Sequence, residues 1–344
     1  MTMTMTMTMT KSASARGGTL RRRAFVVATI AGLAALPFVS PVEAQPAYPS
    51  HAITLVVPYP AGGSADVLAR AIGQRLGERL HQAVVVENHA GAATAIGARD
   101  VARAAPDGYT LLLGTVSSQA INPAMNKVGY DPVADFTAIA PIGSIPFVLV
   151  ANPQAHLDSV ADVIARAKAK PGELSYASAG IGTSNHLAGE LFASDAHIKM
   201  LHVPYKGSAP ALTDVLAGHV PLMFDLQATS LAHVRAGRLK ALAVTSPQRS
   251  ELLPDVPTMS ESGLPGYEVS AWFGVFAPAG VPKPIVEKLN AEISAIISSP
   301  EMKKRLQDLG VSADVATAPE YAAFVRREAA KWAATVKSAG LAPS

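Results

Sequence analysis

The sequence contains no cysteine among its 344 residues. A chain without thiols forms no disulfide, has no cysteine nucleophile and offers no thiolate ligand to a metal. Aromatic residues make up only 6% of the chain and charged residues 16%. No basic stretch with interleaved aromatic residues occurs, so nothing indicates nucleic-acid binding. After residue 44, no apolar run reaches the roughly 20 residues that a membrane-spanning helix needs.

The first 44 residues have the pattern of an export leader. A Met-Thr repeat over residues 1–10 has no core-forming pattern and is set aside. Basic residues from Lys11 to Arg23 precede an apolar run over 24–36, and Val42-Glu43-Ala44 fits a small-x-small cleavage site. The sequence therefore predicts a signal peptide cleaved before Gln45. Because Arg22-Arg23 also resembles a twin-arginine signal, the general secretory and twin-arginine routes both stay open.

Removal of the leader changes the net charge. The whole chain has 29 basic and 26 acidic residues, and five of the basic residues and one acidic residue lie in the leader. The remainder has 24 basic and 25 acidic residues, a net charge of −1. At about 300 residues it is long enough to bury the cores of two lobes without disulfides.

Strand and helix patterns alternate along this remainder. In the first part, strands are predicted over 53–57, 83–87 and 109–114, and helices over 65–80 and 94–105. In a second series, strands are predicted over 147–150, 174–177, 200–203, 222–225 and 241–245, and helices over 159–170, 184–194, 209–217 and 229–236. The strand runs are apolar throughout, which is typical of a parallel sheet covered on both faces.

The C-terminal part is too small for a third domain. A strand over 269–276 is followed by helical patterns over 282–298, 301–309 and 319–339. We expect this part to return to the first lobe, which makes two crossings, near Ser144 and near Ser270, and so a hinge. The prediction is an α/β fold with two lobes, 51–146 plus 270–344 and 147–269, each a mostly parallel sheet flanked by helices.

Two Gly-rich turns each lead from a strand into a helix. The first occupies residues 58–66 and the second residues 178–184. A helix N-terminus leaves backbone N–H groups free, which makes it a ready anion site. Two such turns, far apart in the sequence, predict a cleft between the lobes that binds a small carboxylate. Each turn is also compatible with an ordinary capped connection between a strand and a helix.

The residues of both turns are the first candidates for ligand binding. In the first turn we expect backbone N–H groups to bind the carboxylate and Ser64 to be the N-cap, with Ala61, Gly62, Gly63 and Ser64 as the site residues. Asp66 is interpreted as structural, because a free carboxylate would repel an anion. In the second turn Thr183 or Ser184 is the expected cap, and the site residues are Ser178, Ala179, Gly180, Gly182 and Thr183.

Four further side chains are candidates. Ser117 follows a strand, at the edge where ligands of α/β proteins bind. His186, in the first helical turn after 178–184, can donate to an anion, or it is a packing residue. Tyr205 ends a strand and covers the cleft, or it is a half-buried aromatic. Asp225 also ends a strand and can bind an ammonium or hydroxyl group, or it pairs with backbone.

Several motifs in collinear order resemble one family. They include Pro58-Tyr59-Pro60-Ala61-Gly62-Gly63, Ala105-Pro106-Asp107-Gly108-Tyr109-Thr110-Leu111-Leu112, Tyr176-Ala177-Ser178-Ala179-Gly180, His202-Val203-Pro204-Tyr205-Lys206-Gly207-Ser208 and Leu253-Pro254-Asp255-Val256-Pro257-Thr258. Together they resemble the Bug family, the TctC-like extracytoplasmic solute receptors of tripartite tricarboxylate transporters. The resemblance covers residues 53–335. One departure is that residues 91–97 lack the usual Gly-Gly-Asn before Ile96-Gly97.

The resemblance implies a periplasmic, two-lobed "flytrap" protein. It implies a mono-, di- or tricarboxylate ligand, aliphatic or aromatic, held partly through ordered water and backbone groups. It also implies delivery of that ligand to membrane transporter subunits, and it adds Tyr59 of the first motif to the expected ligand-binding residues. We expect a monomer without metal or cofactor, in which the ligand favours the closed state of the hinge.

Two other functions stay open. A hydrolase is suggested by Tyr176-Ala177-Ser178-Ala179-Gly180, in which Tyr176 replaces the first Gly of a Gly-x-Ser-x-Gly elbow. A ligand-sensing receptor would bind the same ligand and dock on a sensor kinase. No dinucleotide loop, phosphate loop or His-Glu-x-x-His spacing occurs, and the expectation is a binding protein rather than an enzyme.

Overall fold

The computed structural model describes residues 48–338 and residue 341. Its strands form one mixed sheet in the order β2-β1-β3-β9-β4-β7-β5-β6, and β8 and β10 also pair with β4. The strands are β1 (Ile53–Val57), β2 (Val84–Asn88), β3 (Thr110–Thr115), β4 (Phe136–Ala151), β5 (Ser175–Ser178), β6 (Leu201–Pro204), β7 (Leu222–Leu226), β8 (Lys240–Val244), β9 (Ser270–Pro278) and β10 (Ser312–Ala313).

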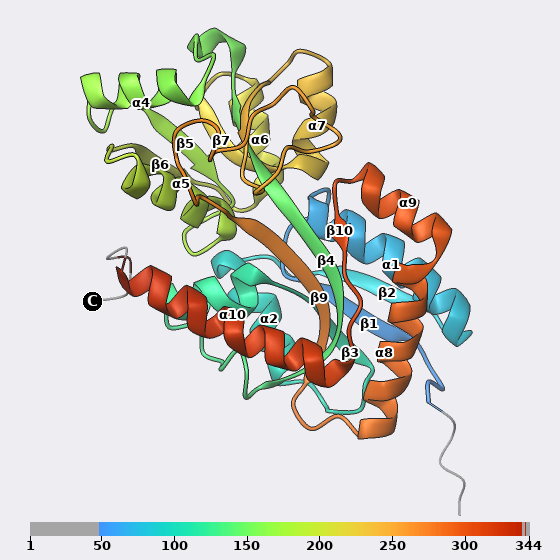
Figure 1. Cartoon of the computed structure of the whole chain (residues 1–344). Helices are drawn as coiled ribbons and strands as arrows, with labels where there is room; N and C mark the ends of the chain where they lie inside the picture. The colour runs from blue at the N-terminus through green and yellow to red at the C-terminus, as the bar shows by residue number, and fades with distance from the viewer. Residues whose placement is uncertain (1–47, 339–340, 342–344) are drawn as a thin grey trace, which may run out of the picture. The chain divides into compact units, whose positions relative to one another are not determined.

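Helices flank this sheet (Figure 1). They are α1 (Ser64–Leu80), α2 (Ala95–Ala102), α3 (Asn122–Met125), α4 (Val160–Ala169), α5 (Ser184–Asp195), α6 (Ser208–Leu216), α7 (Gln227–Arg235), α8 (Lys283–Ser298), α9 (Pro300–Asp308) and α10 (Ala318–Ser338). Three shorter segments are η1 (Ala92–Thr94), the π-helical turn η2 (Ser117–Ile121) and η3 (Pro153–Ala155). The described helices contain none that combines the length and apolar character of a membrane span.

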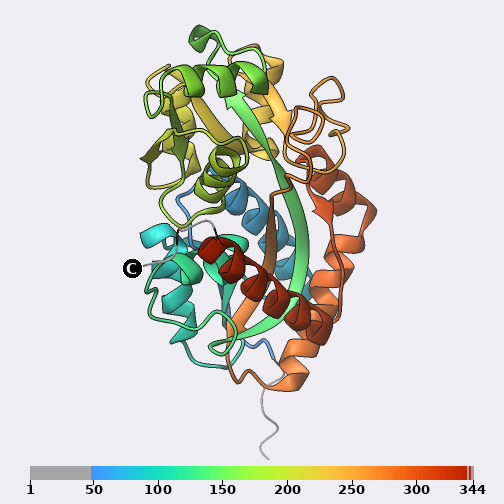
Figure 2. The same cartoon turned by 60° about the vertical axis from the view of Figure 1, so that its left-hand side comes forward.

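Strand β4 connects two groups of strands. Its first part pairs with β9, from Phe136 opposite Pro278 to Pro146 opposite Ser270. Its last part, from Phe147 to Ala151, pairs with β7. Figures 1 and 2 show β4 and β9 running together between the two groups. The predicted crossings near Ser144 and Ser270 thus fall within paired strands, and the lobe boundaries 51–146 plus 270–344 and 147–269 stay a prediction.

The α/β fold with helices on a sheet is confirmed. The outer strands are parallel, as the apolar runs indicated: β1 pairs in parallel with β2 and β3, and β5 pairs in parallel with β6 and β7. The pairings of β4 with β7, β8, β9 and β10, and of β3 with β9, are antiparallel. The sheet is therefore mixed, and each of these antiparallel pairings involves one or both of the long central strands β4 and β9.

The first half of β4 was not predicted as a strand. It contains Pro141 and Pro146, and proline is usually confined to edge strands or bulges because it has no N–H to donate. The register with β9 shifts between Ala138 and Ala140 and again between Pro141 and Gly143. These irregularities accommodate Pro141 within a central strand.

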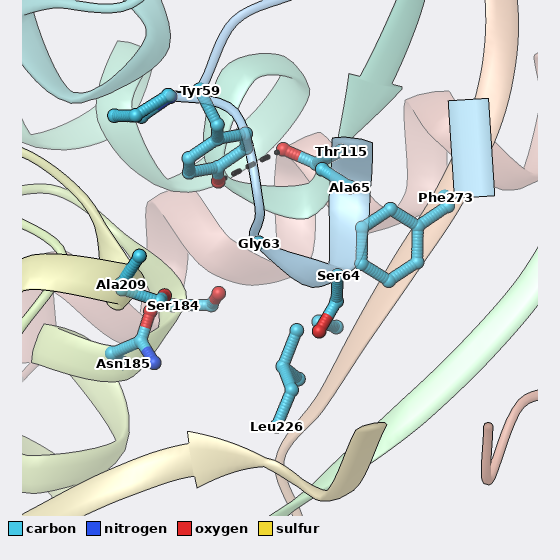
Figure 3. A pocket seen from close by; sticks show the side chains of 13 residues that line it. Tyr59, Gly63, Ser64, Ala65, Thr115, Ser184, Asn185, Ala209, Leu226 and Phe273 are labelled. Atoms are coloured by element: carbon cyan, nitrogen blue, oxygen red, sulfur yellow. Dashed lines mark hydrogen bonds between the residues drawn. The ribbon is translucent and has the colours of Figure 1, made fainter. Parts of the chain in front are cut away.

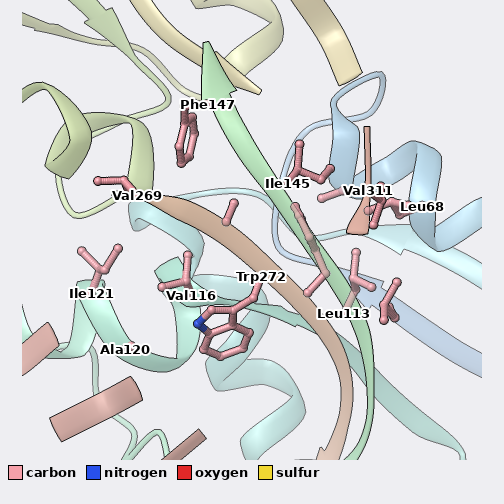
Figure 4. Close-up of a cluster of buried hydrophobic side chains, with 14 of the residues drawn as sticks. Leu68, Leu113, Val116, Ala120, Ile121, Ile145, Phe147, Val269, Trp272 and Val311 are labelled. Carbon is pink, nitrogen blue, oxygen red and sulfur yellow. The ribbon is translucent and has the colours of Figure 1, made fainter. Parts of the chain in front are cut away.

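The core lies where the helices meet the central strands (Figure 4). Leu113 of β3, Ile145 of β4 and Trp272 of β9 are buried together with Leu68 of α1. In α1, Leu68, Ile72 and Leu76 recur every four residues, so they form one apolar face. The packing of this face holds the N-terminus of α1 at the end of β1, where the first Gly-rich turn lies.

Candidate functional site

A cavity lies at the C-terminal end of β1 and at the ends of several other elements (Figure 3). It encloses about 470 Å³ of free space, including the part open to solvent. Its lining residues are Tyr59, Pro60, Gly63, Ser64, Ala65, Thr115, Ser184, Asn185, Ser208, Ala209, Leu226, Ala271 and Phe273. None of them has a charged side chain. We call this space the first cavity.

Four helix N-termini reach the first cavity. Ser64 begins α1, Ser184 begins α5, Ser208 begins α6, and Leu226 is the N-cap residue of α7. In none of these four helices does the side chain of the N-cap residue accept a hydrogen bond from the helix, and Ser117 Oγ takes only the first N–H of α5. Each helix N-terminus has a partial positive charge of about half a unit and free N–H donors. The cavity therefore attracts an anion without containing a cationic side chain.

The hydroxyl of Ser64 is the clearest unused donor. Ser64 is 5% exposed, and its Oγ has no hydrogen-bond partner within the described chain. Figure 3 shows this oxygen pointing into the space between Ser64 and Leu226. A buried hydroxyl without a partner costs free energy, which a ligand oxygen in the cavity would recover.

One wall of the first cavity is apolar and another is polar. Leu226, Ala271 and Phe273 supply apolar surface. On the other side the hydroxyls of Tyr59 and Thr115 lie 3.4 Å apart (Figure 3), and burial raises the pKa of Tyr59, which stays a neutral donor. The arrangement suits a molecule with one acidic group and a hydrocarbon part.

A second cavity borders the first and shares Tyr59 and Pro60 with it. It encloses about 390 Å³ of free space, including its open part. Its other lining residues are Pro58, Gly91, Ala92, Ala93, Thr94, Ala179, Gly180, Tyr205, Lys206 and Gly207. Loops that are distant in the sequence thus meet at the two cavities.

In the first Gly-rich turn, only some of the residues that we expected to bind the ligand line a cavity. Tyr59, Gly63 and Ser64 line the first cavity, whereas Ala61 and Gly62 line neither cavity. The expectation that Ser64 caps α1 is wrong, because Gly63 has extended backbone (φ −83°, ψ 171°) and is the N-cap itself. Gly62 donates its N–H to Asp66 Oδ2 at 3.0 Å, so that N–H is not free for a ligand.

The structural interpretation of Asp66 is confirmed. Its carboxylate accepts hydrogen bonds from Gly62, Arg70 and Asn88 and forms an ion pair with Arg70. Burial opposes ionisation, but these hydrogen bonds outweigh it and lower the pKa of Asp66. The carboxylate therefore fixes the turn from within and does not face the cavity.

The second Gly-rich turn is held mostly by its own hydrogen bonds. Ser178 Oγ accepts from Gly180 N, and Thr183 Oγ1 donates to Gly180 O at 2.6 Å. Ala179 and Gly180 line the second cavity, whereas Ser178, Gly182 and Thr183 line neither. The expected side-chain cap is absent: Thr183 is the N-cap residue of α5 but makes no capping bond.

Ser117 positions the N-terminus of α5. Its Oγ accepts from Ser184 N at 3.0 Å and donates to Ser184 Oγ at 3.3 Å. Ser117 is fully buried and lines neither cavity. It contacts the site through Ser184, which does line the first cavity.

His186 faces the interior of the molecule. Its ring lies 4.1 Å from that of His202, and Gly182 N donates to its Nδ1 at 3.4 Å. Burial lowers the pKa of His186 to about 4, and burial together with His186 lowers that of His202 to about 4. His186 thus accepts a bond from the turn, and the expectation that it donates to a ligand has no geometric support.

A serine–histidine pair is present but enclosed. His202 Nε2 lies 2.6 Å from Ser178 Oγ, a distance suited to a nucleophile and its base. Ser178 is fully buried and lines neither cavity. A substrate in either cavity would not meet this hydroxyl.

Tyr205 and Asp225 also have internal partners. Tyr205 lines the second cavity, but its hydroxyl donates to Asp214 Oδ2 at 2.6 Å. Asp225 is fully buried and lines neither cavity, and its Oδ2 accepts from Thr229 Oγ1 at 2.6 Å. Burial raises the pKa of Asp225 to about 7 although the bonds from Thr229 and the backbone at Leu226 lower it. This geometry fits the interpretation of Asp225 as a structural acid better than the interpretation that it contacts the ligand.

Sequence reasoning missed several lining residues. Ser208 follows Gly207 at a helix start. The same signal indicated Ser64, so the sequence could have identified Ser208 as well. Thr115 lies two residues before the predicted Ser117, and Asn185 directly precedes the predicted His186. Ala271 and Phe273 had no local signal, because they reach the cavity only through the pairing of β9 with β3 and β4.

Comparison with known proteins identifies the family. The model of the tripartite tricarboxylate transporter family receptor, TctC, matches residues 68–341. The chain belongs to the TctC family. Protein BugT of Bordetella pertussis (strain Tohama I) is 39% identical over 312 residues, which cover 90% of this chain and 94% of BugT. The predicted family is thereby confirmed, and TctC proteins are solute-binding receptors of the periplasm.

Solved TctC-like structures share the fold along their whole length. The periplasmic binding protein BugD is 37% identical with a TM-score of 0.82, covering 86% of this chain and 100% of BugD. An R. palustris protein with adipate is 38% identical with a TM-score of 0.83, covering 86% and 100% of the two chains. MatC from Rhodopseudomonas palustris with bound malate is 34% identical with a TM-score of 0.80, covering 84% and 100%.

Proposed function

We propose that this protein is a periplasmic solute-binding protein that captures a small carboxylate for a tripartite tricarboxylate-type transporter. The observation that carries the proposal is the meeting of four helix N-termini, none capped by the side chain of its own N-cap residue, at a cavity lined by no charged side chain. Such a site gives an anion both hydrogen-bond donors and a positive potential. The carboxylates bound by the two R. palustris proteins, adipate and malate, support this ligand class.

The mechanism follows from where the four helices belong. Helix α1 follows β1 in one group of strands, whereas α5, α6 and α7 flank β5, β6 and β7 in the other. A carboxylate that bonds to both sets binds best when the groups are close together. Ligand affinity for this arrangement would shift the population toward it. The protein holds and releases its ligand and catalyses no reaction on it.

Isothermal titration calorimetry and thermal unfolding of the purified protein test the proposal. The panel contains adipate, malate, hexanoate and benzoate, with neutral hexanamide as the control. At about 100 times its dissociation constant, a ligand should stabilise the protein by roughly 2.7 kcal/mol. We expect carboxylates to stabilise and hexanamide to have no effect. If no acid has an effect, or hexanamide matches hexanoate, the proposal fails.

A single hydroxyl tests where the carboxylate binds. Replacement Ser64→Ala removes the unpartnered donor, so the affinity for carboxylates should fall about tenfold while the free energy of unfolding changes little. The matched control is Ser194→Ala, because Ser194 is an exposed serine of α5 outside both cavities. Equal affinities of Ser64→Ala and the control would contradict a ligand contact at Ser64.

A further inference from the structure

One contact between the two groups of strands is made by the protein's own hydroxyl groups. Ser117 of η2 follows β3 in the N-terminal group (β1, β2 and β3), whereas Ser184 begins α5 in the group around β5 (β5, β6 and β7). The hydroxyl of Ser117 accepts from Ser184 N at 3.0 Å and donates to Ser184 Oγ at 3.3 Å. Two hydrogen bonds thus join the groups at the border of the first cavity, which Ser184 lines.

This contact is shielded from water. Ser117 is 0% exposed and Ser184 is 5% exposed. The N–H of Ser184 is the first of α5, so it has no acceptor within the helix, and the side chain of the N-cap Thr183 forms no capping bond. If the two groups moved apart, water would reach this N–H and both hydroxyls. Ser117 therefore replaces water at the N-terminus of α5 only when the groups are together.

Ser117 is presented by a segment that is fixed to its own group. Ser118 Oγ accepts from Thr115 N at 2.9 Å and donates to Thr115 O at 3.2 Å, and the hydroxyl of Tyr130 donates to Ser118 O at 2.7 Å. These bonds hold η2 at the end of β3. The segment is a π-helical turn, a rare conformation that is frequent at functional sites. Ser117 therefore moves with the N-terminal group and not with α5.

A second contact brings the turn before α5 to the same place. A Cβ atom at Gly182 would lie 2.8 Å from Asn122 Oδ1 and 2.9 Å from Asn126 Nδ2. Asn122 begins α3 and Asn126 follows it, so both belong to the N-terminal group. Any side chain at position 182 would hold the groups apart. The backbone of this turn therefore approaches α3 closely, which places Ser184 against Ser117.

We propose that Ser117 and Ser184 form a latch that stabilises the closed arrangement of the two groups before any ligand binds. Ser117 is then a positioning residue, because it fixes the N-terminus of α5 at the first cavity without contacting the ligand itself. The latch sets the ratio of closed to open molecules, so a ligand that favours the closed form has a smaller population to shift. This inference rests on the hinge closure of the proposed function and adds to it a stabilisation that is independent of which acid binds.

Distance measurements in the absence of ligand test the latch. Because the chain has no cysteine, Arg103→Cys and Lys199→Cys place one spin label at an exposed position in each group. Double electron–electron resonance then gives the fractions of closed and open molecules. Adipate is the probe acid, and its addition to the labelled wild-type protein defines the closed distance.

Three variants separate the latch from general stability. Ser117→Ala removes the latch hydroxyl. Ser184→Pro removes the donor from the other side, and proline suits the first position of a helix after the extended Thr183 (φ −89°, ψ 161°). Ser118→Ala is the matched control, because Ser118 is a fully buried neighbour whose hydroxyl bonds only within the N-terminal group.

Without ligand, the ratio of closed to open molecules should fall about tenfold in Ser117→Ala, because the Ser184 N–H loses its partner in the closed form alone. Ser184→Pro should cause a similar fall, and the double variant should fall no further, since both residues act through one contact. Ser118→Ala should lower the free energy of unfolding in urea and leave the ratio unchanged. In Ser117→Ala, the affinities for adipate and hexanoate should weaken by the same factor, about tenfold at most.

Three results would overturn the inference. An unchanged ratio in Ser117→Ala would refute the latch directly. An equal fall in Ser118→Ala would show that the loss of a buried hydroxyl destabilises η2 in general. A wild-type protein without closed molecules before adipate is added would refute the latch and leave the proposed function intact. If instead no acid of the panel changes the distance, the hinge closure of the proposed function is itself refuted.

Discussion

Asp225 stands out among the individual residues because it is an acid in a fully buried position. One of its carboxylate oxygens bonds to Thr229, and the other, Oδ1, has no partner in the described chain. Burial raises its pKa from the ordinary 3.8 to about 7. In the unfolded chain the group ionises near its ordinary pKa. As pH rises from about 4 to 7, the unfolded state therefore releases its proton before the folded state does.

Because the pKa of Asp225 is raised in the folded state, its contribution to the free energy of unfolding falls as pH rises. The contribution of Asp225 to stability is fully present below pH 3.8 and declines until the pH passes 7. Three pKa units correspond to about 4 kcal/mol at most. We predict that Asp225→Asn removes this decline, so that wild type loses more free energy of unfolding than the variant between pH 5 and pH 8. Urea denaturation at both pH values measures it, and parallel losses in the two proteins would contradict the raised pKa.

Among the elements, η1 depends most on a distant side chain. Asn122, at the start of α3, is 1% exposed and supplies donors to two η1 carbonyls. We predict that Asn122→Ala lowers the free energy of unfolding by about 2 kcal/mol, roughly 1 kcal/mol for each lost hydrogen bond. Amide hydrogen exchange should also become faster at residues 91–95, because Ala92, Ala93 and Thr94 have strained φ values of 46°, 49° and 85° that would relax.

A matched control exists in the same fold. Asn290 of α8 likewise bonds two carbonyls, those of Ile139 and Ala316, through its Nδ2. Asn290→Ala should lose a similar free energy of unfolding while exchange at residues 91–95 stays unchanged. If both variants accelerate exchange there, the effect reflects general destabilisation, and η1 does not depend on Asn122 in particular.

The elements also show what local sequence patterns can predict. The apolar face of α1 and the turns before α1 and α5 depend on neighbouring residues, so they were predicted from the sequence. The N-cap of α1 was misplaced by one residue because Gly63 and Ser64 are both acceptable caps, and only the backbone angle of Gly63 decides between them. The prolines of β4 hid a strand whose partner, β9, lies more than 100 residues later in the chain.

In the candidate site, too, a local pattern predicts some residues, whereas others depend on long-range packing. Tyr59, Gly63 and Ser64 belong to a turn with a local pattern, and they line the first cavity. Phe273 lines it only because long-range pairing places β9 between β3 and β4. The partners that turn His186 and Asp225 away from the cavities, His202 and Thr229, are set by packing and by side-chain rotamers, which a pattern of residue types does not specify.

For the whole molecule, the contact of Gly207 with Pro60 brings the two groups of strands together beside the cavities. A Cβ atom at Gly207 would lie 2.8 Å from Pro60 Cγ, and the φ of Gly207 is 136°. We predict that Gly207→Ala keeps the fold but lowers adipate affinity about tenfold, because a methyl group there opposes the approach of the turn before α6 to the turn before α1. Calorimetry and urea denaturation measure the two effects.

The control separates closure from backbone strain. Gly263 also has a positive φ, 97°, but a Cβ atom there would meet nothing within 4 Å. Gly263→Ala should therefore destabilise the protein by about 1–2 kcal/mol, as a strained backbone does, with adipate affinity unchanged. Equal losses of affinity in the two variants would show that the contact with Pro60 has no part in closure.

The position of β9 in the sheet determines the order in which the two groups of strands can fold. It lies between β3 and β4, although it follows them in the chain by more than 100 residues. Until residues 270–278 have left the ribosome or the export channel, β3 and β4 have no strand to join them, whereas β4 to β8 can already pair with one another. The group of strands around β5 can thus fold while the chain is still emerging. The N-terminal group is synthesised first, but it finishes folding last because it needs β9.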